Sequence, residues 1–140
     1  MEIDPRGPRF GAVITVVVLA VVLLTGSAWL LAAQTVVFAV GALAGLRYAP
    51  YGIVYRYLVR PRLGPPAHTE AEAPPRFSQG MGMVFAAAGV GCYALGGTVG
   101  GIVLTALALV AAFLNAAFDL CLGCQVYLFI QRNLTVRPSA

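Results

Sequence analysis

Residues 102–130 read IVLTALALVAAFLNAAFDLCLGCQVYLFI, an apolar stretch longer than a bilayer span that carries a pair of cysteines near its end. A helix that crosses the ~30 Å hydrocarbon core of a bilayer needs about 20 residues. The stretch therefore predicts one long transmembrane helix from about Ile102 to Ile130, whose end projects into the membrane interface. The cysteine pair, Cys121-Leu122-Gly123-Cys124, is the strongest candidate for chemistry in the chain.

Three further apolar stretches predict transmembrane helices, at about Phe10–Leu24, Ala28–Leu46 and Ser78–Leu95. The chain has 140 residues, of which 60% are hydrophobic and 10% charged, and its mean hydropathy is +0.87. Soluble domains carry about 25% charged residues, so the composition excludes an ordinary soluble domain. We expect an all-α membrane protein with four transmembrane helices in a single domain, residues 1–140.

Two short motifs occur twice, at corresponding places along the chain. Pro8-Arg9-Phe10 recurs as Pro75-Arg76-Phe77, and Val54-Tyr55 recurs as Val126-Tyr127. Each copy of the first motif precedes two spans that a polar or glycine-containing turn connects. The sequence thus predicts two parallel helical-hairpin repeats. Their approximate ranges are residues 8–60 and 76–132, with a polar, exposed and partly flexible cytoplasmic linker at 61–75.

The segment that ends the first repeat contains a helix breaker, Pro50, which we expect to stop or kink the second span. The apolar residues beyond it share one helical face: Tyr51, Val54, Tyr55 and Leu58. This pattern predicts a short amphipathic helix in the membrane interface, with its aromatic rings at headgroup depth. When the two repeats are aligned, Cys121 and Cys124 fall near residues 48–51.

All nine basic residues are arginines, and they lie in the N-terminal arm, in the segment 47–76 and in the C-terminal tail. The connections at residues 25–27 and 96–101 carry no charge. The positive-inside rule therefore predicts a multi-pass protein of the plasma membrane with both termini in the cytoplasm. Since this orientation accounts for the arginines, we expect no nucleic-acid partner.

Small residues at four-residue spacing occur in and beside the spans. Such spacing lets helix backbones approach closely in lipid, either inside the chain or in a homo-oligomer. The pairs are Gly41 with Gly45, Ala87 with Gly91, Gly96 with Gly100, and Gly97 with Gly101.

In an unbroken helix Cys121 and Cys124 lie about 60° apart on one face, with Cα atoms about 5 Å apart, which a disulfide permits. The pair would then lie toward the C-terminal end of its helix, where the dipole opposes thiolate formation. Reactivity would require compensation, either a local break at Gly123 or cytoplasmic arginines brought close by the fold, such as Arg6, Arg9, Arg47 or Arg76. Thiol redox or sulfur handling, structural packing and, more weakly, metal binding by the pair all stay open. A closed zinc site requires four nitrogen or sulfur ligands. Only an oligomer that brings cysteine pairs from several chains together would supply them.

Asp119 is the acidic residue within the apolar stretches, and Asn115 lies one helical turn before it. A carboxylate inside a membrane is costly and is a functional candidate. In a regular helix, however, their shared face points about 140–200° away from the thiols. We therefore expect Asp119 to pair with an arginine or to cap a neighbouring helix rather than to act as a base for Cys121. No phosphate-binding loop, Ser-His-Asp set or paired acid/base carboxylates occur, and we expect no cofactor.

Several segments together resemble one family: Asp4-Pro5-Arg6-Gly7-Pro8-Arg9-Phe10, Arg47-Tyr48-Ala49-Pro50-Tyr51-Gly52, Arg60-Pro61-Arg62-Leu63-Gly64-Pro65-Pro66, Pro75-Arg76-Phe77 and Cys121-Leu122-Gly123-Cys124. The chain is similar over nearly its whole length to the bacterial, mainly actinobacterial, membrane family catalogued as domain of unknown function 4395. The resemblance implies an association with thioredoxin-like or rhodanese-like proteins, beside which some members are encoded or to which they are fused. Related members often have a glycine and an aromatic residue before the paired thiol, so Asp119 carries little weight from the family.

We thus expect a membrane-anchored thiol redox or sulfur-relay protein that uses Cys121 and Cys124 at the cytoplasmic face with a soluble thioredoxin-like or rhodanese-like partner. If it is an enzyme, it is a component of a membrane thiol-disulfide oxidoreductase. The alternatives are a scaffold subunit whose cysteines only pack, and a small oligomeric carrier of sulfur species or metal.

Overall fold

The computed structural model describes residues 2–118 and 120–135, and it is helical apart from one short ribbon. The ribbon pairs β1 (Glu2–Ile3) antiparallel with β2 (Glu70–Ala71). The expected all-helical class is therefore confirmed. The α-helices are α1 (Arg6–Thr25), α2 (Ala28–Ala39), α3 (Pro50–Val54), α4 (Arg60–Leu63), α5 (Ala73–Ala94), α6 (Thr98–Phe118) and α7 (Leu122–Thr135).

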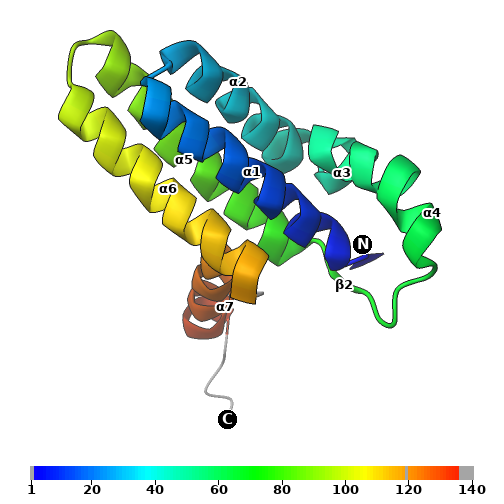
Figure 1. Cartoon of the computed structure of the whole chain (residues 1–140). Coiled ribbons are helices and arrows are strands. Elements are labelled where there is room, and N and C mark those ends of the chain that lie inside the picture. Colours follow the sequence, from blue (N-terminus) through cyan, green and yellow to red (C-terminus); the bar gives the residue numbers. More distant parts are fainter. Residues whose placement is uncertain (1, 119, 136–140) are drawn as a thin grey trace.

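Helices α1, α2, α5 and α6 lie side by side as a bundle (Figure 1). Helix α5 packs against both α2 and α6, and α1 packs against α6. The turns that join α1 to α2 and α5 to α6 lie at one end of the bundle (Figure 1). The N-terminal arm, the segment from α3 to β2, and α7 lie at the other end. The buried core is formed by Leu19 and Val22 of α1, Leu31 and Phe38 of α2, and Ala86 of α5.

Two helices, α1 and α6, are long and apolar enough to cross a membrane. Only 22% of the apolar window of α1 and 11% of that of α6 are buried inside the fold. A helix in the core of a soluble protein would be buried over most of such a window. Helix α2, together with the π-helical turn that follows it, is shorter, at Ala28–Ala44.

The first break in the bundle lies after α2, but it comes at Gly45, five residues before Pro50, so the prediction that Pro50 itself stops the second span is wrong. Helix α2 continues into a π-helical turn at Val40–Ala44 and stops at Gly45, whose φ of +115° favours glycine. A short 3₁₀ turn at Leu46–Tyr48 follows, and Pro50 occupies the first turn of α3, where a proline costs no hydrogen bond.

A second break lies after α6, so the prediction of one continuous helix over residues 102–130 is wrong. Helix α6 ends at Phe118 and α7 begins at Leu122, while Leu120 and Cys121 are not helical. The backbone N–H of Leu120 donates to the carbonyl of Leu114 at 3.1 Å, which closes the end of α6 with a wide turn. Hydropathy does not reveal this break, because the sequence is apolar on both sides of it.

The segment after Pro50 differs from the expected interfacial helix. A π-helical turn at Tyr55–Val59 follows α3, and its wider spacing rotates later residues away from the face that Tyr51 and Tyr55 share. Tyr55 is 2% exposed, whereas Leu58 is 64% exposed. The ring of Tyr55 is therefore buried inside the fold rather than presented on an exposed face of an interfacial helix.

Asp4 ties the N-terminal arm to this segment. Its carboxylate accepts hydrogen bonds from the Arg6 guanidinium at 3.0 Å and from the Tyr55 hydroxyl at 2.9 Å, and Arg60 lies 3.8 Å away. Burial acts to raise the pKa of Asp4, but the hydrogen bonds from Arg6 and Tyr55 outweigh it, so the pKa lies below its usual value. The predicted linker, residues 61–75, is partly structured, because β2 within it pairs with β1 of the N-terminal arm.

The two copies of the Pro-Arg-Phe motif make corresponding contacts. Arg9 of α1 donates to the carbonyls of Ala116 and Ala117 at the end of α6, at 3.1 and 3.4 Å. Arg76 of α5 donates to Ala42 and Leu43 at the end of α2, at 2.7 and 2.9 Å. Both guanidinium groups therefore cap carbonyls that a helix C-terminus leaves without partners.

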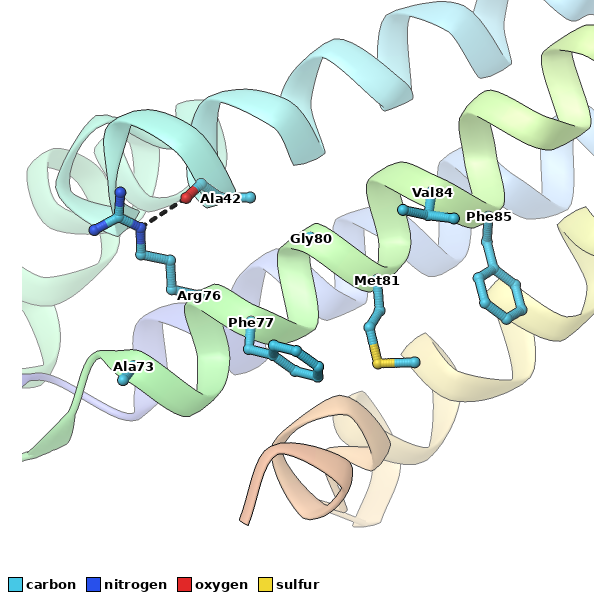
Figure 2. A pocket seen from close by; sticks show the side chains of 8 residues that line it. All are labelled: Ala42, Ala73, Arg76, Phe77, Gly80, Met81, Val84 and Phe85. Atoms are coloured by element: carbon cyan, nitrogen blue, oxygen red, sulfur yellow. Dashed lines mark hydrogen bonds between the residues drawn. The ribbon is translucent and has the colours of Figure 1, made fainter. Parts of the chain in front are cut away.

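The phenylalanines of the motif also correspond. The rings of Phe10 and Tyr55 lie 5.7 Å apart, and those of Phe77 and Tyr127 lie 5.5 Å apart. Figure 2 shows Arg76 reaching Ala42 while Phe77 points away from it. Ala42, Arg76 and Phe77 line a cavity of about 510 Å³ along α5. Because the charged group in its lining, Arg76, is engaged with backbone carbonyls, this cavity is not the candidate site.

Several of the regularly spaced glycines serve packing within the chain. A Cβ added to Gly101 of α6 would lie 2.9 Å from the ring of Tyr93, and one added to Gly41 would lie 3.1 Å from the side chain of Gln79. Gly91, in contrast, has open space around it.

Candidate functional site

Cys121 and Cys124 form a disulfide where α7 begins. Their Cα atoms are 5.2 Å apart, which agrees with the spacing that the sequence predicts. Cys121 directly precedes the first helical residue, and Cys124 lies in the first turn. Both side chains are partly buried.

The sulfur of Cys121 occupies the capping position of α7. The backbone N–H of Cys124 donates to Cys121 Sγ at 3.1 Å, and that of Gln125 donates to the carbonyl of Cys121 at 3.0 Å. The first N–H groups of a helix and its dipole favour negative charge. The expectation that the dipole opposes a thiolate here is therefore wrong, because the pair lies at the start of a new helix and not at the end of an old one.

Gly123 brings the first turn of α7 directly against α5. A Cβ at this position would lie 2.6 Å from Ser78 Cβ and 2.7 Å from Ser78 Cα. Since the second of these atoms is backbone, only glycine fits without moving a helix. The contact fixes the cysteine pair relative to the bundle.

The disulfide lines a cavity of about 720 Å³ between α1, α5, α6 and α7. Asn115, in the last turn of α6, lines the same cavity as Cys121 and Cys124. The face of Asn115 is therefore not directed away from the thiols, as it would be in a continuous helix, because α7 turns away at the end of α6 (Figure 1). Asp119 lies outside the described residues.

Four arginines were expected to approach the thiols. One of them, Arg9, donates hydrogen bonds to Ala116 and Ala117, which lie in the last turn of α6, shortly before the cysteine pair in the sequence. Arg6 binds Asp4 and the carbonyl of Gly64 instead. Arg76 binds the end of α2.

The described residues contain no group of three or more His, Cys, Asp or Glu side chains that could hold a metal ion. Cys92 is a free thiol that packs beside Gly100 near the turn between α5 and α6. His68 lies 3.4 Å from Glu70, exposed in the segment before α5. Within the part of the chain that the structure describes, the metal alternative thus has no third ligand.

Among the polar residues of the site that sequence reasoning missed are Ser78 and Gln79, which line the cavity from α5. The one indication of them in the sequence is their position directly after the Pro75-Arg76-Phe77 motif. The cavity itself joins segments more than 100 residues apart, such as Pro8 and Asn115, and no spacing within the sequence reports it.

No curated protein and no solved structure matches the chain. The profile of one family, described as Domain of unknown function (DUF4395), matches residues 3–132. The match covers both copies of the Pro-Arg-Phe motif and the cysteine pair. The chain therefore belongs to the DUF4395 family.

Proposed function

We propose that this chain is a membrane-anchored thiol–disulfide exchange protein, in which Cys121 is the attacking thiol and Cys124 the resolving thiol. The observation that carries the proposal is the position of Cys121 Sγ, which caps the N-terminus of α7 and accepts the N–H of Cys124. Reactive cysteines occur at helix N-termini because the thiolate is the nucleophile and the helix stabilises it. We assign Cys124, which lies inside the first turn of α7, as the resolving thiol.

The proposed setting is the plasma membrane, with four spans in two hairpin repeats and both termini in the cytoplasm. The exposed apolar faces of α1 and α6 support it. The corresponding contacts of Arg9 and Arg76 support the repeat. The arginine-bearing segments lie at one end of the bundle and the uncharged turns at the other (Figure 1), which fits the positive-inside rule.

The exchange proceeds through a mixed disulfide. When the pair is reduced, the Cys121 thiolate attacks a disulfide of a soluble thioredoxin-like partner, and one sulfur of the partner leaves as a thiolate. The Cys124 thiolate then attacks Cys121 Sγ, forms the disulfide of this chain and releases the partner as a dithiol. Transfer of a sulfane sulfur from a rhodanese-like partner to the Cys121 thiolate would use the same attacking group.

The test uses the full-length protein with Cys92→Ser, so that only the pair is labelled. The protein is equilibrated with reduced or oxidised thioredoxin and then treated with a maleimide that shifts its mobility on a gel. We expect two labels per chain after reduced thioredoxin and none after oxidised thioredoxin. A pair that thioredoxin neither reduces nor oxidises would contradict the proposal.

A matched pair of variants tests the two roles. Cys124→Ser should accumulate a mixed disulfide with a thioredoxin that lacks its own resolving cysteine, whereas Cys121→Ser should not. Equal trapping by both variants would contradict the assignment of Cys121 as the attacking thiol.

The second candidate is a structural disulfide that only holds the first turn of α7 rigid, since its two cysteines are three residues apart in the sequence. The close contact of Gly123, which lies between them, with Ser78 favours it, because that contact fixes the same turn against α5. In that case reduction lowers the free energy of unfolding and exchange with thioredoxin is slow. In the proposed exchange protein the reduced and oxidised forms are both folded, and the gel-shift assay reads them directly.

A further inference from the structure

The cavity beside the disulfide extends further into the bundle than exchange with a soluble protein requires. Along α1 it is lined from Pro5 to Thr15, which is about 15 Å at the helical rise per residue. This is about half the thickness of the hydrocarbon core of a bilayer. Its volume of about 720 Å³ lies within the range of about 300–1,000 Å³ found for sites that bind small molecules.

The walls of the cavity are mainly apolar. Phe38, Phe85 and Leu107 contribute large side chains, and alanines of α6, among them Ala111, leave room between them. Glu70, at the end near the β-ribbon, is the charged residue among the described residues of the lining. A cofactor with phosphate groups, such as a nicotinamide or flavin nucleotide, would find no cation there to bind them.

Among the polar side chains that line the cavity, three come from α5 and α6: Ser78, Gln79 and Asn115. Within the described residues none of the three takes part in a hydrogen bond, so their donors are available to a ligand. An apolar cavity with a few hydrogen-bond donors suits a flat, uncharged ring that carries carbonyl oxygens.

From these observations we propose that the cavity binds a lipid quinone, which accepts the two electrons of the reduced Cys121–Cys124 pair. The inference rests on the proposed thiol exchange and names the second substrate of the same site. A quinone matches the pair in stoichiometry, because both take part in two-electron, two-proton steps. Its isoprenoid chain and ring are soluble in the bilayer that surrounds the bundle.

The reaction balances without a further reactant. The two thiols each lose a proton and together lose two electrons, and the S–S bond forms between Cys121 and Cys124. The two carbonyl oxygens of the quinone each gain a hydrogen, which gives the quinol. A soluble dithiol then reduces the disulfide again, so the net reaction transfers two electrons from the soluble partner to the quinone.

The experiment uses the full-length Cys92→Ser protein in detergent micelles, reduced and freed of reductant. A short-chain benzoquinone with every ring position substituted is added, so that thiols cannot add to the ring. Loss of quinone absorbance and formation of the disulfide are followed together. We expect equal amounts of quinol and disulfide, formed faster than in the Cys121→Ser protein.

Two substitutions by phenylalanine separate the cavity from the rest of the bundle. Ala111→Phe fills the cavity and should slow quinone reduction by about tenfold or more, because the ring no longer reaches the thiols. Ala87→Phe places the same side chain at an exposed position of α5 and should leave the rate unchanged. Asn115→Leu, which keeps the number and branching of the side-chain heavy atoms but removes the hydrogen-bond donor, should raise the KM for quinone even if Ala111→Phe fails to fold.

Exchange with thioredoxin is measured in parallel on every variant. If the pair exchanges with thioredoxin but quinone reduction is no faster than in Cys121→Ser, the quinone inference fails and the proposed function stands. Equal rates for Ala111→Phe and Ala87→Phe, with the Asn115→Leu KM unchanged, also overturn the inference. A pair that exchanges with neither reactant contradicts both.

Discussion

The contact between Gly123 and Ser78 makes a quantitative prediction for Gly123→Ala. The added Cβ would lie 2.7 Å from Ser78 Cα, whereas ordinary van der Waals contact begins at 3.4 Å. Helices α5 and α7 must therefore separate by about 0.7 Å at this point. Overpacking of this kind costs about 1–3 kcal/mol, while replacing a helical glycine by alanine gains about 0.5–1 kcal/mol.

The matched control is Gly91→Ala in α5, where nothing lies within 4 Å of the added Cβ. We expect this variant to be stabilised by about 0.5–1 kcal/mol and Gly123→Ala to be less stable than it by about 1–3 kcal/mol. The difference between the two variants isolates the contact. The free energy of unfolding is measured in detergent micelles by circular dichroism.

Adding Ser78→Gly to Gly123→Ala should recover only part of the loss, since it removes the side chain of Ser78 and leaves its Cα in place. If Gly123→Ala and Gly91→Ala have the same stability, α7 does not lie against α5 as described, and the reasoning about the site fails with it.

Three further predictions concern the polar contacts of the fold. Asp4→Asn should cost about 1–3 kcal/mol at neutral pH. Because the folded-state pKa of Asp4 lies below its usual value, the wild-type advantage is lost as the pH falls through that pKa. Unfolding curves of both proteins, extended well below the usual pKa of an aspartate, test this, and parallel profiles over the whole range would count against it. Arg76→Met removes two hydrogen bonds to the end of α2 and should lower the free energy of unfolding by about 1–3 kcal/mol. The control Arg62→Met, at an exposed position, should change the free energy of unfolding by less than about 0.5 kcal/mol. Equal effects of the two variants would refute the capping role of Arg76. Tyr51→Phe removes the hydrogen bond to the buried side-chain carbonyl oxygen of Gln34 and should lower the free energy of unfolding by about 1–2 kcal/mol. Adding Gln34→Met should recover this stability, because the amide nitrogen of Gln34 already lacks a partner among the described residues.

The approximate bounds of the first helices follow from the sequence because each is a separate apolar run. Phe10–Leu24 falls within α1, and Ala28–Leu46 ends two residues beyond the π-helical turn that completes α2. Helix α5 begins at Ala73, five residues before the predicted Ser78, because Pro74 and Pro75 fit the first turn of a helix, where no N–H partner is lost.

The break between α6 and α7 could not be predicted from hydropathy, because residues on both sides of it are equally apolar. It depends on tertiary structure: Gly123 of α7 approaches the backbone of α5, and Cys121 Sγ caps the new helix. The predicted alignment of two repeats did contain a signal. It sets the cysteine pair near Pro50, and the chain is also broken just before that residue, at Gly45.

Only part of the candidate site could be predicted from the sequence. The spacing of Cys121 and Cys124 identifies the pair. The orientation of Asn115 toward the same cavity follows from the change in direction at the end of α6, and Ser78 joins the site through a contact across 45 residues. No local pattern encodes either relation.

The central claim is that the start of α7 activates Cys121. It is tested most directly by the alkylation rates of two single-cysteine proteins, one with Cys121 alone and one with Cys124 alone, treated with iodoacetamide at pH 7. We expect Cys121 to react faster by at least about tenfold, because the thiolate is the reacting form and the helix N-terminus stabilises it. If Cys124 reacts as fast as Cys121 or faster, the capping position does not activate the thiol and the account is contradicted.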